Sequence, residues 1–242
     1  MAEPKTPAQS QAKGIAAKQS SSAEVGAFIE KVRAMTPAAS GRGRLIFAMD
    51  ATMSRQPTWD LALKLQGDMF QAVKDVGGLD VQLVYFRGFN ETRASKWVGD
   101  PDAVAGLMAR VACEGGYTQI RKVLSHARGE SEATRVNALV YVGDAMEENI
   151  DELAQRAGEL RLLGVPCFMF QEGQDKKAER AFKEIARLTR GAYCRFDSGS
   201  ATQLRELLAA VAVYATGGRK ALKDFSQATR SSAGSRLLEQ LG

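Results

Sequence analysis

From Leu45 onward, short apolar runs alternate with longer segments of helical periodicity, and this alternation restricts the fold more than any other feature. The apolar runs predict strands at 45–49, 81–86, 137–143, 165–170 and 191–196, with a shorter and more polar one at 95–99. The intervening and following segments predict helices at 58–76, 101–112, 118–128, 148–163, 175–190 and 200–215. Strands that alternate with helices form parallel βαβ units, and uninterrupted apolar runs are typical of strands buried on both faces. We therefore expect an α/β fold with three layers: a doubly wound, mostly parallel six-stranded sheet with helices on both faces.

The two ends of the chain differ in composition from this body. Residues 1–22 are rich in Ala, Gln, Ser, Lys and Pro and contain almost no large apolar side chain, so we expect a disordered N-terminal tail. Residues 23–42 predict a short amphipathic helix and a linker, and residues 217–242 predict a C-terminal linker and a weak helix at 234–241. These boundaries leave one α/β domain over 43–216.

The net charge of +5 is concentrated at the two ends. Residues 1–44 hold seven Lys and Arg against three acidic residues, and 217–242 hold five against two, which leaves residues 45–216 at −2. A nucleic-acid-binding domain would carry its basic excess on the body, so a nucleic-acid partner is not expected. No apolar stretch reaches the roughly 18–20 residues of a membrane span. The first residues also lack the apolar core of a secretory signal, so we expect a cytoplasmic protein without membrane association.

Oxygen-bearing side chains stand where two of the predicted strands end. Asp50, Thr52 and Ser54 follow the first strand at alternate positions, and Asp144 follows the fourth. Thr118 lies in the segment "GGYT", at the start of a predicted helix. If the first and fourth strands are neighbours, the two carboxylates face each other at the switch point of the sheet. A set of oxygens without nitrogen or sulfur favours a hard divalent cation, Mg²⁺ or Mn²⁺.

These residues and their order resemble the metal-ion-dependent adhesion site (MIDAS) of the von Willebrand factor A (VWA) domain family, which has a Rossmann-like fold. The family's D-x-S-x-S motif corresponds to Asp50-Ala51-Thr52-Met53-Ser54, its loop threonine to Thr118 in "GGYTQI", and its later aspartate to Asp144 in "YVGDAMEE". The resemblance covers roughly residues 43–215. The chain departs from the pattern with Thr52 in place of the commoner serine, and with "GDAMEE" where many members have Asp-Gly.

The resemblance implies that the hydroxyls of Thr52, Ser54 and Thr118 contact the metal, and that Asp50 and Asp144 act directly or through water. It further implies a metal-ion-dependent protein-binding module rather than an enzyme, in which the cation captures a carboxylate of the partner. Intracellular relatives, of which this chain resembles a bacterial-type member, often serve AAA+ ATPases, chaperones or multi-subunit assemblies.

Two other interpretations of the same residues stay open. Asp50 and Thr52 could simply cap the helix that follows them, with Asp144 capping the next one. A haloacid-dehalogenase-like phosphatase would use Asp50 as nucleophile and Lys122 as its lysine, but Thr52 stands where that family needs a second aspartate as general acid. A P-loop NTPase is excluded because no G-x-x-x-x-G-K-[ST] occurs, and a dinucleotide enzyme because "DATMSRQP" contains no glycine.

Four further residues lie close to the motif in sequence. Trp59, soon after Ser54, and Tyr117, beside Thr118, are candidates for the rim that contacts a partner, with packing between loops as the alternative. The acidic pair Glu147-Glu148 predicts an exposed first helical turn, where the helix dipole favours negative charge.

Overall fold

Six strands form one sheet in the order β3-β2-β1-β4-β5-β6. A computed structural model describes residues 42–73, 77–196, 200–229 and 231–241; the predicted tail at 1–22 and the predicted helix and linker at 23–42, except Arg42, lie outside the described residues. The strands are β1 (Gly43–Asp50), β2 (Leu79–Arg87), β3 (Glu91–Ala94), β4 (Ala138–Gly143), β5 (Cys167–Glu172) and β6 (Ala192–Phe196). β1, β2, β4, β5 and β6 pair in parallel, and β3 is antiparallel to β2. The predicted mostly parallel, six-stranded sheet is therefore confirmed.

β1 shows why the apolar runs form strands covered on both faces. Every side chain from Leu45 to Met49 is buried. Because successive side chains of a strand point to opposite faces, Leu45, Phe47 and Met49 join one hydrophobic cluster, while Ile46 and Ala48 join the other. A strand of this composition is stable only inside a three-layer arrangement.

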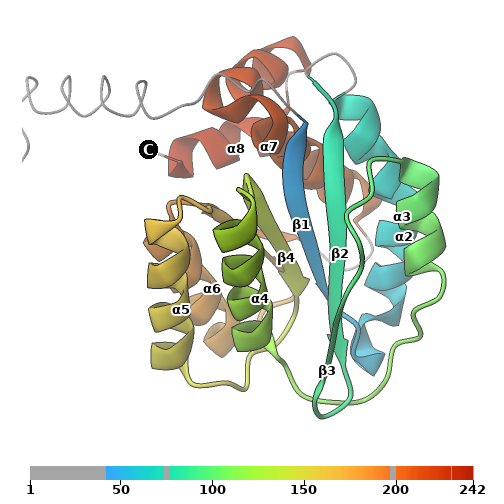
Figure 1. Ribbon diagram of the computed structural model, residues 1–242, viewed down its shortest axis with the longest axis vertical. Helices are drawn as coiled ribbons and strands as arrows, with labels where there is room; N and C mark the ends of the chain where they lie inside the picture. Colours follow the sequence, from blue (N-terminus) through green and yellow to red (C-terminus); the bar gives the residue numbers. More distant parts are fainter. Residues whose placement is uncertain (1–41, 74–76, 197–199, 230, 242) are drawn as a thin grey trace, which may run out of the picture. The chain divides into compact units, whose positions relative to one another are not determined.

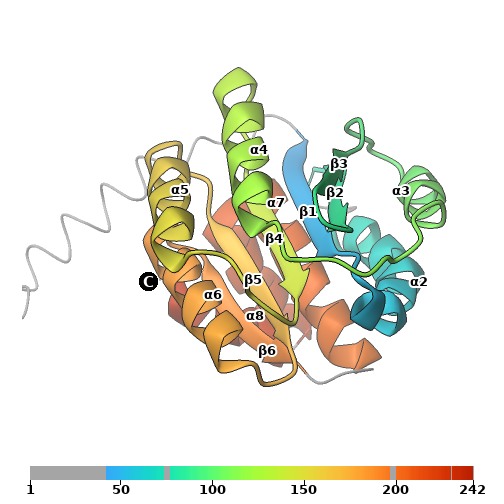
Figure 2. The same cartoon turned by 90° about the horizontal axis from the view of Figure 1, so that it is seen from below.

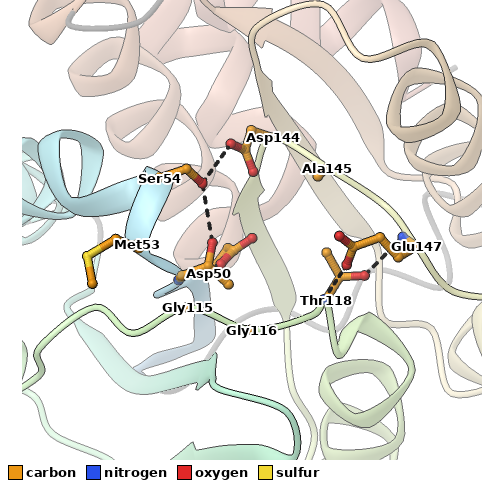
Figure 3. A pocket seen from close by; sticks show the side chains of 10 residues that line it. Asp50, Met53, Ser54, Gly115, Gly116, Thr118, Asp144, Ala145 and Glu147 are labelled. Atoms are coloured by element: carbon orange, nitrogen blue, oxygen red, sulfur yellow. Dashed lines mark hydrogen bonds between the residues drawn. The ribbon is translucent and has the colours of Figure 1, made fainter.

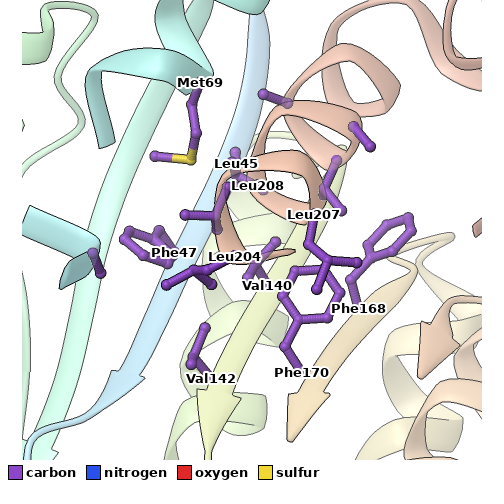
Figure 4. Close-up of a cluster of buried hydrophobic side chains, with 14 of the residues drawn as sticks. Leu45, Phe47, Met69, Val140, Val142, Phe168, Phe170, Leu204, Leu207 and Leu208 are labelled. Carbon is purple, nitrogen blue, oxygen red and sulfur yellow. The ribbon is translucent and has the colours of Figure 1, made fainter. Parts of the chain in front are cut away.

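Helices cover both faces of the sheet, as expected (Figures 1 and 2). α2 (Gln56–Ala72), α3 (Pro101–Met108), α7 (Ala201–Thr229) and α8 (Ser232–Gln240) contribute to the first cluster. In that cluster Phe47, Val140 and Phe170 of the sheet lie against Leu204 and Leu207 of α7 (Figure 4). α4 (Ile120–Ala133), α5 (Ile150–Leu162) and α6 (Lys176–Thr189) contribute to the second cluster.

The edge strand next to β2 is not at the predicted position. A strand was expected at 95–99, but β3 spans Glu91–Ala94, and Val98 makes only an isolated bridge to Val81. Gly88, at φ 57°, allows the chain to reverse directly after β2, so antiparallel pairing begins almost at once. The residues of β3 are half-buried or exposed, and an edge strand of this kind lacks the apolar run that marks a buried one.

The C-terminal segment, for which a linker and a weak helix at 234–241 were expected, is helical and packed over most of its length. α7 continues from Ala201 to Thr229, with a kink at Gly218 (φ 66°, ψ −161°), and α8 follows over Ser232–Gln240. Leu222 and Leu237 are fully buried in the first cluster. In the part of the chain that the structure describes, no helix combines the length and the apolar content required to cross a membrane.

Candidate metal centre

The carboxyl ends of β1 and β4 meet at the point where the strand order of the sheet reverses. β1 and β4 are hydrogen-bonded neighbours, with Met49 opposite Val142. Asp50 is the last residue of β1, and Asp144 directly follows β4. In doubly wound sheets the connections on the two sides of such a switch point diverge and leave room for a ligand. The predicted site required the first and fourth strands to be neighbours, and the structure shows that they are.

A pocket of about 200 Å³ lies at this switch point, and all five candidate ligands line it (Figure 3). The pocket is formed by the end of β1 and the segment between β1 and α2, the loop before α4, and the loop between β4 and α5. The complete lining consists of Asp50, Thr52, Met53, Ser54, Gly115, Gly116, Thr118, Asp144, Ala145 and Glu147. Three segments far apart in sequence thus contribute oxygen atoms to one cavity.

Thr52 and Ser54, which follow β1, connect the two aspartates. The backbone N–H of Thr52 donates to Asp50 Oδ1 at 2.7 Å, and the Thr52 Oγ1 and Ser54 Oγ atoms lie 3.4 Å apart. Ser54 Oγ donates to Asp144 Oδ2 at 3.2 Å (Figure 3). The short 3₁₀ helix Met53–Arg55 turns the chain here and brings Thr52 and Ser54 to the same side.

The capping interpretation of these residues does not agree with the contacts. Thr52 precedes the 3₁₀ helix but makes no side-chain cap hydrogen bond, and the N-cap of α2 is Arg55. The N-cap of α5 is Asn149, whose side chain accepts from the N–H groups of Asp151 and Glu152. Asp144 is therefore not needed for the start of α5, and its carboxylate faces the pocket.

Two glutamates of the β4–α5 loop hold the segment that carries Thr118. Glu147 accepts a hydrogen bond from the Thr118 N–H at 2.8 Å, and its own N–H donates to Thr118 Oγ1 at 3.1 Å. The Glu148 carboxylate accepts from the N–H groups of Ile120 and Arg121, at the beginning of α4. The prediction for this acidic pair is wrong, because α5 begins only at Ile150. Glu148 instead caps α4 from another loop, and Glu147 binds Thr118 in the segment before that helix.

A buried arginine beside the pocket was not found by sequence reasoning. Arg55 is 2% exposed and forms an ion pair with Glu172 at the end of β5, and its Nη1 lies 3.8 Å from Asp144 Oδ2. Thr58 of α2 donates its hydroxyl hydrogen to the same glutamate. The Nε and Nη2 atoms of Arg55 have no hydrogen-bond partner within the described residues. An arginine at the start of a helix is normally solvated, so periodicity carried no signal for its burial.

Electrostatics at Asp50 favour a cation in the pocket. The residue is 1% exposed, and burial raises its pKa from the ordinary 3.8 to about 6, with Asp144 adding to the rise. Hydrogen bonds from Thr52 and the charge of Arg55 lower it only in part. A divalent cation would supply the missing compensation for this carboxylate.

The donor set consists of oxygen atoms, which are the ligands that hard divalent cations prefer. Within the described residues, no group of three or more His, Cys, Asp and Glu could hold a metal ion. The pocket instead combines two carboxylates with three hydroxyls, which suits Mg²⁺ or Mn²⁺ with retained water molecules. Few of these ligands carry charge, so the affinity expected for the cation is modest.

The two rim candidates have different surroundings. Trp59 does not lie on a rim: it is 1% exposed, its Nε1–H donates to the Met108 carbonyl at 3.1 Å, and its ring packs edge-on against Tyr85. Its position in α2 directs it toward α3 and into the core. Tyr117 is exposed and follows Gly116 of the pocket, so it does lie beside the opening.

Comparison with solved structures identifies the fold, whereas no family model and no curated protein matches the sequence. The SpRpn10 VWA domain matches with a TM-score of 0.54 and 12% identity over 68% of this chain and 94% of that chain. An aerotolerance-related membrane protein from Bacteroides fragilis matches with a TM-score of 0.53 and 16% identity, over 69% and 96% of the two chains. Proximal thread matrix protein 1 from the mussel byssus, in a structure with a zinc-occupied MIDAS motif, matches with a TM-score of 0.55 and 17% identity. The match covers 73% of this chain and 46% of that chain. The chain therefore has the fold of a VWA domain.

Proposed function

We propose that this protein is a metal-ion-dependent protein-binding module whose pocket holds Mg²⁺ or Mn²⁺. The observation that carries the proposal is the convergence of Asp50, Thr52, Ser54, Thr118 and Asp144 on one pocket at the sheet's switch point. The burial of Asp50 and the hydroxyl-rich donor set support a cation there. One of the similar structures has a zinc-occupied MIDAS motif, which shows that this fold accommodates a metal in that protein.

Each site residue has a separate part in this proposal. The hydroxyls of Thr52, Ser54 and Thr118 would contact the cation, and Asp50 and Asp144 would hold it directly or through water. When bound, the cation supplies an open coordination position that attracts an anion. Three neutral ligands leave the cation electron-poor, so a carboxylate of a partner protein is the natural occupant of that position.

The partner class is a further part of the proposal. The VWA fold supports a binding role in preference to an enzymatic one. From the family resemblance, an AAA+ ATPase, a chaperone or another multi-subunit assembly in the cytoplasm is the partner we would look for first.

Thermal denaturation with and without metal tests the site. Mg²⁺ at 100 times its dissociation constant should stabilise the fold by about 2.7 kcal/mol through linkage, visible as a higher Tm. The variant Asp50→Ala should lose this response. Asp102→Ala, which removes an exposed carboxylate from the first turn of α3, is the matched control and should retain it. An equal response to Mg²⁺ in wild type and Asp50→Ala would contradict the assignment of the site.

A pull-down tests the partner contact. Wild type and Asp50→Ala are each used as bait, with Mg²⁺ and with EDTA. We expect a partner that wild type retains only with metal. Partners retained equally in all four samples would refute the metal-dependent mechanism and leave the fold unaffected.

The phosphatase alternative is disfavoured by the position of its lysine. Lys122 donates its Nζ hydrogens to the carbonyl of Asn90 and to Gln119 Oε1, and it does not line the pocket. Thr52 also offers no carboxyl group to protonate a leaving group. Turnover of a generic aryl phosphate that requires metal and disappears in Asp50→Ala would favour the enzyme instead.

A further inference from the structure

Two neighbouring aromatic side chains are exposed beside the pocket. Among the described residues the exposed large hydrophobic side chains are Met53, Phe89, Tyr117 and Leu162. Phe89 is 76% and Tyr117 58% exposed, and their rings pack edge to face with centroids 5.5 Å apart. Tyr117 stands between Gly116 and Thr118 of the pocket lining, and Met53 lines the pocket itself. We call Phe89 and Tyr117 the aromatic pair.

The backbone beneath the aromatic pair is held by close contacts. The Tyr117 N–H donates to the Gly88 carbonyl at 3.1 Å, which joins the β2–β3 turn to the loop before α4. A Cβ atom on Gly116 would lie only 1.9 Å from that carbonyl oxygen, so the two backbones are in direct contact. Gln119 Nε2 adds a hydrogen bond to the Arg87 carbonyl at 3.1 Å. The pair is therefore presented on a fixed base, which reduces the entropy lost on binding.

The charged groups next to the pair are engaged within the protein. Arg87 forms ion pairs with Glu91 and Glu114, and Lys122 donates to the Asn90 carbonyl. The aromatic pair thus presents apolar ring surface next to an oxygen-rich pocket. Two adjacent rings that remain in water contribute little to folding, and aromatic residues are enriched in protein interfaces.

We infer that the aromatic pair is a second contact site, which binds an aliphatic or aromatic side chain placed close in sequence to the partner's metal-binding carboxylate. The inference rests on the proposed function, because the pocket and the pair would then bind one peptide segment together. The cation selects the acidic residue, and the rings select its apolar neighbour. The partner motif is therefore an Asp or Glu with a large apolar residue one or two positions away.

Peptide titrations of the isotope-labelled full-length chain, followed by NMR, test this inference. The probes are four hexapeptides of glycine with one Asp and one Phe, the Phe one or two positions before or after the Asp. Matched peptides replace Phe by Gly, or Asp by Asn. With Mg²⁺ we expect at least one Asp-plus-Phe peptide to bind about tenfold more tightly than the Asp-only peptide, as a hot-spot contact would give.

Surface variants then locate the contact. Phe89→Ser should abolish most of the gain in affinity that Phe gives and leave the binding of the Asp-only peptide unchanged. Tyr117→Ser should likewise abolish most of that gain. Leu162→Ser is the matched control, because Leu162 is also exposed but lies at the C-terminal end of α5, away from the loop that reaches the pocket. This control should retain the full gain.

The outcomes separate this inference from the proposed function. If, in the presence of Mg²⁺, the Asp-only and the Asp-plus-Phe peptides bind equally tightly, the second contact site is refuted and the metal site is retained. If the Phe of the peptide still increases affinity in EDTA, and if this increase requires Phe89 of the protein, the contact site is retained but its link to the metal is refuted. Absence of binding by every peptide would overturn both. A self-association that Phe89→Ser abolishes would replace the peptide partner by a second copy of the chain.

Discussion

Replacement of Asp50 by asparagine should stabilise the metal-free protein at neutral pH. The folded-state pKa of about 6 lies above the ordinary 3.8 because the carboxylate is buried. For an acid with a raised pKa, the folded state binds the proton more tightly than the unfolded state does. Stability is therefore highest below the unfolded pKa, falls as the pH rises through the interval from about 4 to about 6, and stays lower above it. The neutral amide of the Asp50→Asn variant would avoid this cost of a buried charge.

The size of the effect follows from the same pKa difference. A shift of about two pH units corresponds to about 3 kcal/mol at about 1.4 kcal/mol per unit, which is an upper limit. The amide oxygen of the new side chain can still accept the hydrogen bond from Thr52 N–H, so the local turn is retained. The amide N–H group has to find its own partner at the pocket, which reduces the gain. We expect Asp50→Asn to be about 1–3 kcal/mol more stable than wild type in EDTA at pH 7.5.

Urea denaturation of both proteins in EDTA at pH 7.5 and at pH 4 measures this difference. It should shrink toward zero at the lower pH, where Asp50 in wild type is protonated. Saturating Mg²⁺ at pH 7.5 should reverse the order, since only wild type gains from the cation. Asp102→Asn, at an exposed position, should show neither effect. A variant that is less stable than wild type in EDTA at pH 7.5 would refute the argument that burial makes Asp50 unfavourable without metal.

Three other substitutions give distinct expectations. Arg55→Met should destabilise the protein by about 3–5 kcal/mol in urea denaturation, because it removes the buried guanidinium that pairs with the Glu172 carboxylate; addition of Glu172→Gln should recover part of that loss. Gly116→Ala should displace the loop at the pocket and abolish the Mg²⁺-dependent rise in Tm, while Gly115→Ala, whose Cβ would meet nothing within 4 Å, should keep it. Leu237→Ala should cost about 2–5 kcal/mol, as expected for a core leucine and not for a residue in a weakly attached tail; an unchanged midpoint would contradict the packing of α8.

The buried strands and the content of the site were predictable from local sequence. The runs around Phe47 and Val140 are apolar at every position because both faces of these strands are covered. This pattern is visible in the amino-acid sequence alone. Asp50 and Asp144 follow such runs, so their place at the carboxyl edge of the sheet also follows from local information. The edge strand β3 was misplaced because its half-exposed residues carry no such pattern.

The contacts between loops were decided only by the tertiary structure. The order of the strands places β1 beside β4 and brings the end of β5 within reach of Arg55, which becomes a buried partner of Glu172. The same arrangement allows Glu148 to cap α4, although 28 residues separate it from Ile120. Trp59 enters the core because α3 packs against α2. Periodicity reports whether a side chain is buried within its own element, whereas the neighbours of a loop depend on strand order and helix packing, which are properties of the whole chain.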